Sequence, residues 1–201
     1  MSASAEDKVA LDRMLFFSDA VFAIAITLLV LDLKLPTVGA EGGEAAFQEA
    51  LLGLLPSAIG FLWSFVLIGQ TWIEHHRMGR FLAGTDRGLL WWDLALLMFV
   101  ALMPFTTSLV SEHFASGTAV GLYAAAFGLL GMCKVGLWRH AQHRGLIHGH
   151  PKEVQEIGRR VWATPIVSLA VVLLAIVGVP YAYTLFVTIP VIARFLAART
   201  S

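Results

Sequence analysis

The sequence predicts an all-α, polytopic membrane protein with six transmembrane helices and both termini in the cytoplasm. Two features of the composition indicate a membrane fold. Of the 201 residues, 58% are hydrophobic and only 14% are charged, against roughly a quarter charged residues in a typical soluble domain, and the mean hydropathy is +0.76. A water-soluble domain of this length could not cover so much apolar surface with polar groups. The pattern along the sequence also indicates a membrane fold, because the chain divides into apolar segments.

These segments have the length of about 20 residues that a spanning helix needs. Polar stretches such as the acidic 36–50 and the basic 140–160 separate them, and Gly178 with Pro180 marks a tight break between the last two. We find no internal repeat and predict a single domain over residues 1–201. The predicted transmembrane helices are 14–35, 51–73, 89–111, 118–139, 161–178 and 180–196.

The distribution of basic residues predicts the orientation. With the N-terminus inside the cell, 13 of the 14 lysines and arginines fall on the cytoplasmic side and only Lys34 falls outside, as the positive-inside rule requires. Residues 1–12 contain no apolar signal core, so the first helix is expected to remain and to span the bilayer. We therefore expect a multi-pass protein of the inner (plasma) membrane with both termini cytoplasmic.

Several polar side chains fall at one depth, near the predicted cytoplasmic ends of the helices. Charged groups inside a bilayer are costly unless they pair or face water. One interpretation is that these residues lie at the interface and face water. The interpretation that we favour is a structural clamp that fixes the first helix, in which Arg13, Ser18 and Asp19 bond to one another and to His75 or His76.

The first helix also contains a specific motif. It reads Arg13-Met-Leu-Phe-Phe17-Ser18-Asp19 and continues into an isoleucine-rich run, and this Arg-x-x-x-Phe-Ser-Asp pattern resembles the signature of the transmembrane protein 175 family. The likeness covers nearly the whole chain, including the Met-Pro-Phe-Thr segment at 103–106. The resemblance implies six-helix subunits that assemble as tetrameric cation channels passing potassium, and it places Phe17 in the structural motif.

The resemblance further implies that the first helix lines the pore. The matching positions are Ile24, Leu28 and Leu31, with Thr27 as the polar candidate. Independently, the spacing i, i+4, i+7 puts the three apolar residues on one helix face, although such a stripe alone is typical of ordinary helix packing. The expected constriction is a ring of apolar side chains that closes by excluding water. The sequence has no Thr-Val-Gly-Tyr-Gly segment, so no carbonyl selectivity filter is expected.

Other classes of function remain open. A proton-coupled carrier using Asp19, Asp93 and His75 or His76 is the main alternative, but a carrier usually needs an ionisable group near the midplane, where every predicted helix is apolar. A membrane enzyme or scaffold with its site at the inner face is a third possibility. Because no nucleotide loop, zinc-protease motif or serine nucleophile elbow occurs, we expect no enzyme activity and no cofactor, with potassium as the permeant ion.

The long basic stretch after the fourth predicted helix is rich in histidine. His140, His143, His148 and His150 lack carboxylate or cysteine support for a metal site, so we expect solvated surface residues and no bound metal. Basic residues of this stretch are expected to attract anionic lipid, and Lys134 to extend its stem toward the headgroups. The expected partners are three further copies of the chain, membrane lipid and potassium ions, and no nucleic acid.

Overall fold

The computed structural model describes residues 5–34, 43–113, 115–179 and 181–198. This part of the chain forms α-helices and short 3-10 helices, together with one isolated β-bridge. Five of its helical segments are long and apolar enough to cross a membrane, and a shorter apolar helical segment follows them at Ala182–Ala198. The predicted all-α membrane fold is therefore confirmed, with the last predicted span as its weakest member.

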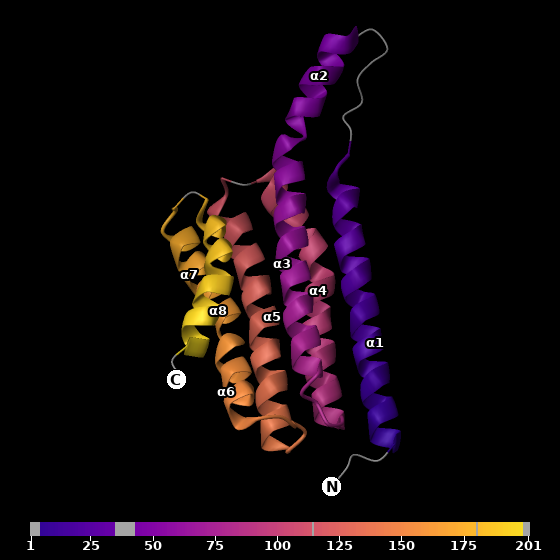
Figure 1. The fold of residues 1–201 in the computed structure, drawn as a ribbon. Helices are drawn as coiled ribbons and strands as arrows, with labels where there is room; N and C mark the ends of the chain where they lie inside the picture. Colours follow the sequence, from indigo (N-terminus) through magenta and orange to yellow (C-terminus); the bar gives the residue numbers. More distant parts are fainter. Residues whose placement is uncertain (1–4, 35–42, 114, 180, 199–201) are drawn as a thin grey trace.

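The first helix, α1 (Ala5–Leu28), continues into the 3-10 turn η1 (Leu29–Asp32). It begins nine residues before the predicted start at 14, and its α-helical part ends well before the predicted end at 35, a position outside the described residues. α1 lies along one edge of the bundle (Figure 1) and packs on α3 and α4. Only one stripe of the helix is buried, by Leu11, Met14, Ser18, Phe22, Ala25 and Leu29.

The helix α2 (Gly43–Gly53) is joined to α3 (Leu55–Gly79) by a single residue. α2 projects beyond the bundle nearly in line with α3 (Figure 1). The sequence interpretation of 36–50 as a loop is therefore wrong from Gly43 onward. α3 also runs six residues past its predicted end at 73. Glu74, His75 and His76 thus lie within the helix. The Glu74 and His75 side chains contact other helices of the subunit.

The helices α4 (Arg87–Glu112) and α5 (Gly117–His143) form the centre of the bundle. Each begins at a side-chain cap, because Asp86 accepts a hydrogen bond from the Leu89 amide and Ser116 accepts one from the Ala119 amide. Such caps satisfy amides that a helix start leaves unpaired. α5 packs between α4 and α7 and contributes the largest share of the buried core.

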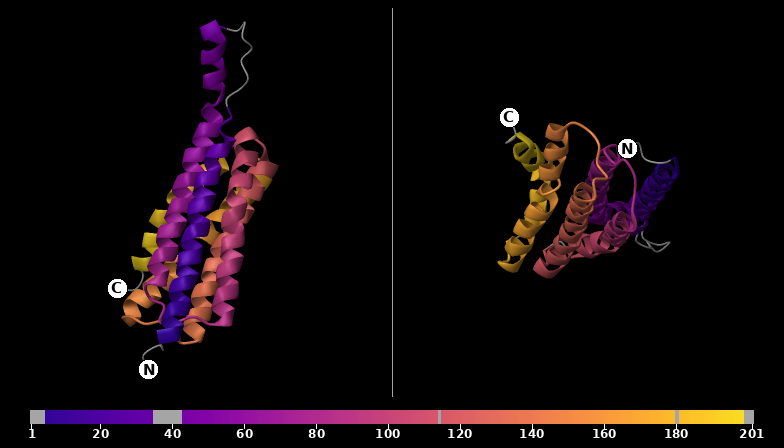
Figure 2. Two further views of the ribbon diagram at one scale, coloured as in Figure 1. Left: turned by 90° about the vertical axis from the view of Figure 1, so that its right-hand side faces the viewer. Right: turned by 90° about the horizontal axis from the view of Figure 1, so that it is seen from below.

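The C-terminal quarter contains α6 (Pro151–Arg160), α7 (Ala163–Ile176), the 3-10 helix η2 (Ala182–Thr188) and α8 (Ile189–Ala198). α7 approaches α5 closely, since a Cβ on Gly128 would lie 2.9 Å from the Ser168 Cβ. The last predicted span, 180–196, is divided between η2 and α8. α7 and α8 lie on the side of the bundle opposite α1, as both views in Figure 2 and Figure 1 show.

One end of the bundle gathers the start of α1, the α3–α4 connection and the α5–α6 connection (Figure 1), and we call it the N-terminal end. The two connections are joined there by the bridge between Leu82 and Ile147 and by the hydrogen bond from the Ala83 amide to the Leu146 carbonyl, 2.8 Å long. α2 projects from the opposite end. The polar clusters described next lie toward the N-terminal end.

Candidate functional site

The predicted pore-lining residues share a surface that the subunit itself leaves uncovered. The exposed fractions are 58% for Ile24, 42% for Leu28 and 63% for Leu31. Thr27 is exposed on the same side, and its hydroxyl donates to the Ile24 carbonyl at 2.8 Å. We call these four residues the α1 apolar face. Leu31 lies in the 3-10 turn rather than in the α-helix, so the predicted i+7 relation is distorted there. The face contains no charged residue.

Behind that face, α1 is held to the subunit by a buried three-residue cluster. The Ser18 hydroxyl donates to Asp93 Oδ2 of α4 at 2.7 Å, and His75 Nε2 of α3 lies 2.8 Å from Asp93 Oδ1. Exposed fractions are 0% for Ser18, 3% for His75 and 2% for Asp93. The ring of Phe22 packs on the His75 imidazole with centroids 5.6 Å apart. One carboxylate therefore joins three helices.

A second, more exposed contact lies beside this cluster. The Trp72 indole N–H donates to Asp19 Oδ1 at 2.7 Å, and the His76 ring lies 5.7 Å from the Trp72 ring. Arg13 and Phe17 are exposed. Within the described chain, Arg13 makes no hydrogen bond or ion pair with any of these groups.

The single network expected from the sequence is therefore corrected to two separate contacts. Ser18 and His75 meet only through Asp93, which the sequence interpretation did not include in the clamp. Asp19 binds Trp72 instead of a histidine. The signal that could have identified Asp93 was its position in an apolar helix at the same depth, because a charged residue there needs a partner.

Lys134 of α5 corrects a further expectation. Its side chain is fully buried and forms an ion pair with Glu74 of α3, and its Nζ lies 3.4 Å from the Thr164 hydroxyl of α7. The ammonium group thus points into the bundle rather than toward the headgroups. Burial of a lone charge is prohibitive, so Glu74 compensates Lys134 where α3, α5 and α7 meet.

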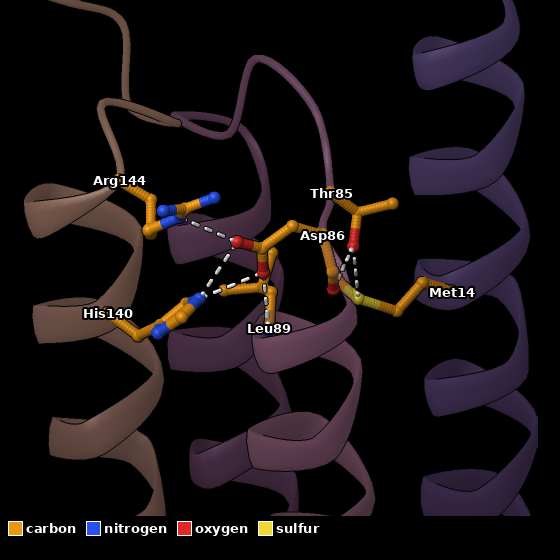
Figure 3. Close-up of polar contacts among 6 residues, drawn as sticks. All are labelled: Met14, Thr85, Asp86, Leu89, His140 and Arg144. Atoms are coloured by element: carbon orange, nitrogen blue, oxygen red, sulfur yellow. Dashed lines mark hydrogen bonds and ion pairs between the residues drawn. The ribbon is translucent and has the colours of Figure 1, made fainter.

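His140 is likewise held by partners rather than free in solvent. Its Nε2 lies 2.8 Å from Asp86 Oδ1, and Arg144 Nε donates to Asp86 Oδ2 at 3.1 Å (Figure 3). Gly88 allows this approach, since a Cβ there would lie 2.4 Å from His140 Cε1. Burial acts to raise the pKa of Asp86, but the bonds from the Leu89 amide, His140 and Arg144 outweigh it and lower that pKa. We call Asp86, His140 and Arg144 the α4–α5 latch.

Thr85, which precedes the latch residue Asp86 in the chain, contacts α1. The Thr85 hydroxyl donates to the Met14 sulfur at 3.7 Å (Figure 3). Among the described residues, no group of three or more histidine, cysteine or acidic side chains has the spacing of a metal site. The polar clusters therefore connect helices to one another, and each of them links segments that are distant in the sequence.

A bundle of long apolar helices with buried polar contacts between them defines the class, which is a polytopic membrane protein. The model of one family, described as endosomal/lysosomal potassium channel TMEM175, matches residues 13–104. A solved structure described as a lysosomal potassium-selective channel TMEM175 homolog from Chamaesiphon minutus is 32% identical, with a TM-score of 0.76, and covers 96% of this chain and 99% of that one. The chain belongs to the TMEM175 family.

Curated relatives agree with this membership. A protein of Chamaesiphon minutus named as a potassium channel is 41% identical over 138 residues, which cover 64% of each chain. One of Streptomyces collinus with the same description is 36% identical over 66% of this chain and 65% of its own. The human endosomal/lysosomal proton channel TMEM175 is 26% identical over 88% of this chain and 36% of its own. The alignment thus covers less than two thirds of the full length of these two bacterial relatives. Their names are those of channels and not of enzymes, as the sequence predicted.

Proposed function

We propose that the chain forms a homotetrameric, potassium-permeable cation channel in the plasma membrane, with both termini in the cytoplasm. The names of the two bacterial relatives and of the solved homologue support potassium as the permeant ion. The distribution of basic residues supports the orientation. The whole chain, residues 1–201, would act as one channel subunit.

The α1 apolar face is the observation on which this proposal rests. An edge helix that leaves Ile24, Leu28 and Leu31 largely exposed while burying its opposite side has a surface for partners outside its own subunit. Four copies of α1 around an axis would place rings of branched side chains along a narrow path. Such rings offer water no hydrogen bonds, so they form a barrier even where an ion nearly fits.

Ion preference follows from the same chemistry. Neither Ile24 nor Leu28 offers an oxygen to replace hydration water, and the sequence contains no Thr-Val-Gly-Tyr-Gly filter. Passage through the rings then favours the ion that loses its hydration water most cheaply, which is potassium rather than sodium. Thr27 would supply a polar neighbour beside the constriction. Modest selectivity is the expected outcome.

The motif residues would act as a clamp rather than as part of the ion path. Ser18 and His75 on Asp93, and Asp19 on Trp72, tie α1 to α3 and α4 on the side away from the apolar face. A clamp of this kind would hold the pore-lining side chains in register. Arg13, Phe17 and His76, which lie next to these contacts, complete the proposed motif region.

A proton-coupled function is the second candidate, because the hydrogen-bonded His75–Asp93 pair is buried and the human relative is named a proton channel. Coupled transport would require proton flux in fixed ratio with a second ion. Liposomes with a potassium gradient and no pH gradient distinguish the two functions. Potassium efflux that builds up a membrane potential and is accelerated by a protonophore supports the channel. Efflux that proceeds without a protonophore and acidifies the liposome lumen in a fixed ratio to the potassium released supports the carrier.

The pore placement is tested by the substitution Ile24→Asn. Asparagine has as many non-hydrogen side-chain atoms as isoleucine but offers water hydrogen bonds, so potassium flux should rise by roughly tenfold for each ~1.4 kcal/mol removed from the barrier. Discrimination against sodium should fall at the same time. The measurement is the current and the bi-ionic reversal potential in planar bilayers at equal protein density.

The matched control is Ile166→Asn, since Ile166 is also an exposed isoleucine, at 46%, but lies on α7 across the bundle. We expect its flux and reversal potential to equal those of the unmodified protein. Unchanged flux and selectivity in a folded Ile24→Asn protein would show that the constriction is elsewhere.

A further inference from the structure

A pocket on the side of the bundle opposite α1 combines basic and apolar walls. It has a volume of about 160 Å³ and lies between α3, α6 and α8, toward the N-terminal end. Three arginines from three different helices line it: Arg77 near the end of α3, Arg160 at the end of α6 and Arg194 in α8. These residues are far apart in the sequence, so only the folded bundle brings them together.

The charges of the pocket are not balanced. Glu74, which also lines it, is compensated by buried Lys134, and Arg160 pairs with Glu156 at 3.2 Å. Among the described residues, Arg77 and Arg194 have no acidic partner. The three arginines together with Lys134 carry four positive charges, and Glu74 with Glu156 carries two negative charges. Two positive charges are therefore left without compensation. An anion is the ligand that this arrangement favours.

The shape of guanidinium groups narrows the choice of anion. A planar guanidinium donates two parallel hydrogen bonds to the oxygens of a phosphate, so arginines converging from separate helices match a tetrahedral phosphate group. Basic pockets between membrane helices are suited to anionic headgroups. The 160 Å³ volume is large enough for one phosphate and part of its glycerol substituent, but not for a whole lipid.

The surroundings indicate a lipid rather than a free phosphate. Ile157 and Ala193, both buried, form apolar parts of the wall. Beside Arg194 on α8, Val191 is 64% exposed and Phe195 is 70% exposed. Acyl chains can lie against these exposed side chains while the phosphate enters the pocket. A free phosphate would gain nothing from an apolar border.

We propose that Arg77, Arg160 and Arg194 bind the phosphate of an anionic phospholipid at the membrane surface. The bound headgroup joins α8 to α3 and α6, and so stabilises the short C-terminal helix that is least able to span the bilayer alone. The site lies away from the α1 apolar face, and its test is independent of ion conduction.

The test uses the full-length protein in a neutral detergent. Short-chain dihexanoyl phosphatidylglycerol is added while the thermal unfolding midpoint is measured, with dihexanoyl phosphatidylcholine and inorganic phosphate as parallel additions. We expect phosphatidylglycerol to raise the midpoint by about 5–10 °C at a concentration near 100 times Kd. Phosphatidylcholine and phosphate at the same concentration should give less than half of that shift.

The variant Arg77→Gln with Arg194→Gln should lose most of the phosphatidylglycerol shift. Its matched control is Lys152→Gln with Arg159→Gln, which removes two exposed charges of α6 at the same end but outside the pocket. That control should keep the full shift. If the double pocket variant does not fold, Arg77→Gln and Arg194→Gln are measured singly, and each should lose part of the shift.

Three results would overturn the proposal. A full shift in the pocket variants would place lipid binding elsewhere. An equal loss in the control would mean that diffuse surface charge is responsible. A phosphate shift as large as that of phosphatidylglycerol would identify a site for the free anion instead of a lipid.

Discussion

At the scale of single residues, Asp93 connects three helices through one side chain. Its two oxygens serve two different helices, one accepting from Ser18 and the other contacting His75. Because the site is almost fully buried, removal of the carboxylate would leave His75 without this partner, whereas Ser18 would keep its hydrogen bond to the Met14 carbonyl, 2.9 Å long. Asp19 differs, since its contact with Trp72 lies at the exposed surface of the subunit.

The expected consequence is a difference in stability between two aspartate substitutions. Asp93→Ala leaves the buried His75 imidazole without this partner, at about 1–3 kcal/mol, and removes one of the two hydrogen bonds of Ser18, at about 0.5–1.5 kcal/mol. The free energy of unfolding should therefore fall by roughly 2–4 kcal/mol. Asp19→Ala loses one exposed contact and should cost about 0.5–1.5 kcal/mol. The measurement is denaturant-induced unfolding in mixed micelles.

Asp93→Asn is the control for this comparison, because an amide retains one acceptor and adds a donor. We expect it to recover at least half of the stability that Asp93→Ala loses. Equal losses for Asp93→Ala and Asp19→Ala would contradict the central role of the buried cluster.

At the scale of helices, the α4–α5 latch joins the start of one central helix to the end of the other. Asp86 caps α4 and simultaneously pairs with His140 of α5 and with Arg144, the residue that follows α5 (Figure 3). The carboxylate lies at the positive end of the α4 dipole and the basic groups lie at the negative end of α5, which is the favourable arrangement for both helices. The latch therefore stabilises two helix ends at once.

Substitution of Asp86 tests the latch. Asp86→Ala removes the cap and should lower the free energy of unfolding by about 0.5–2 kcal/mol. Asp86→Asn keeps the cap but loses the charge, so it isolates the contribution of the pairing. Thermal unfolding of the three proteins at a series of pH values provides the measurement.

The pH dependence of that comparison has a definite sign. Because the pKa of Asp86 is lowered in the folded protein, its charge stabilises the fold fully above the ordinary carboxyl pKa of about 3.9. The contribution is lost as pH falls through the lower, folded value. The unmodified protein should exceed Asp86→Asn in unfolding midpoint at pH 7 and should match it well below pH 4. A difference that persists under strong acid would rule out the charge as its origin.

At the scale of the whole molecule, the helices of the bundle differ in how much of their surface neighbouring helices bury. α5 lies in the interior, whereas α1 lies at an edge of the bundle (Figure 2). The side chains of the α1 apolar face are exposed there. In lipid, apolar exposure alone has no cost, so the absence of charge on this face is compatible with bilayer contact or with a partner subunit. Assembly through α1 is what the proposed channel requires.

Cross-linking distinguishes these two environments of α1. In a Cys133→Ala background, which removes the native cysteine, Leu28→Cys should cross-link between subunits with a short bifunctional maleimide, because four-fold packing brings the α1 faces together. The control Leu173→Cys, 55% exposed on α7, should remain monomeric on a denaturing gel. Native mass spectrometry should give four times the mass of the chain. A monomeric mass with no cross-linking at residue 28 would contradict the assembly.

The sequence by itself determined the class of fold, the order of the apolar helices and the family. Hydrophobicity over a window of about 20 residues is a local property, so it locates spans without knowledge of their neighbours. It located the last span, which the structure divides between η2 and α8, but it missed the end of α3, where polar residues continue the helix from Glu74 to Gly79. The family was predicted from the resemblance of the contiguous Arg-x-x-x-Phe-Ser-Asp motif, which is equally local, and the family model matches residues 13–104.

Only the tertiary structure decided which polar groups meet. Ser18 and Asp93 are 75 positions apart, and Lys134 and Glu74 are 60 apart. The sequence showed that each group needed a partner inside the membrane, but several partners at the same depth were equally compatible with that need. The choice among them depends on the rotation of each helix about its axis. Packing of whole helices sets that rotation, through contacts such as the close approach of α7 to Gly128 of α5.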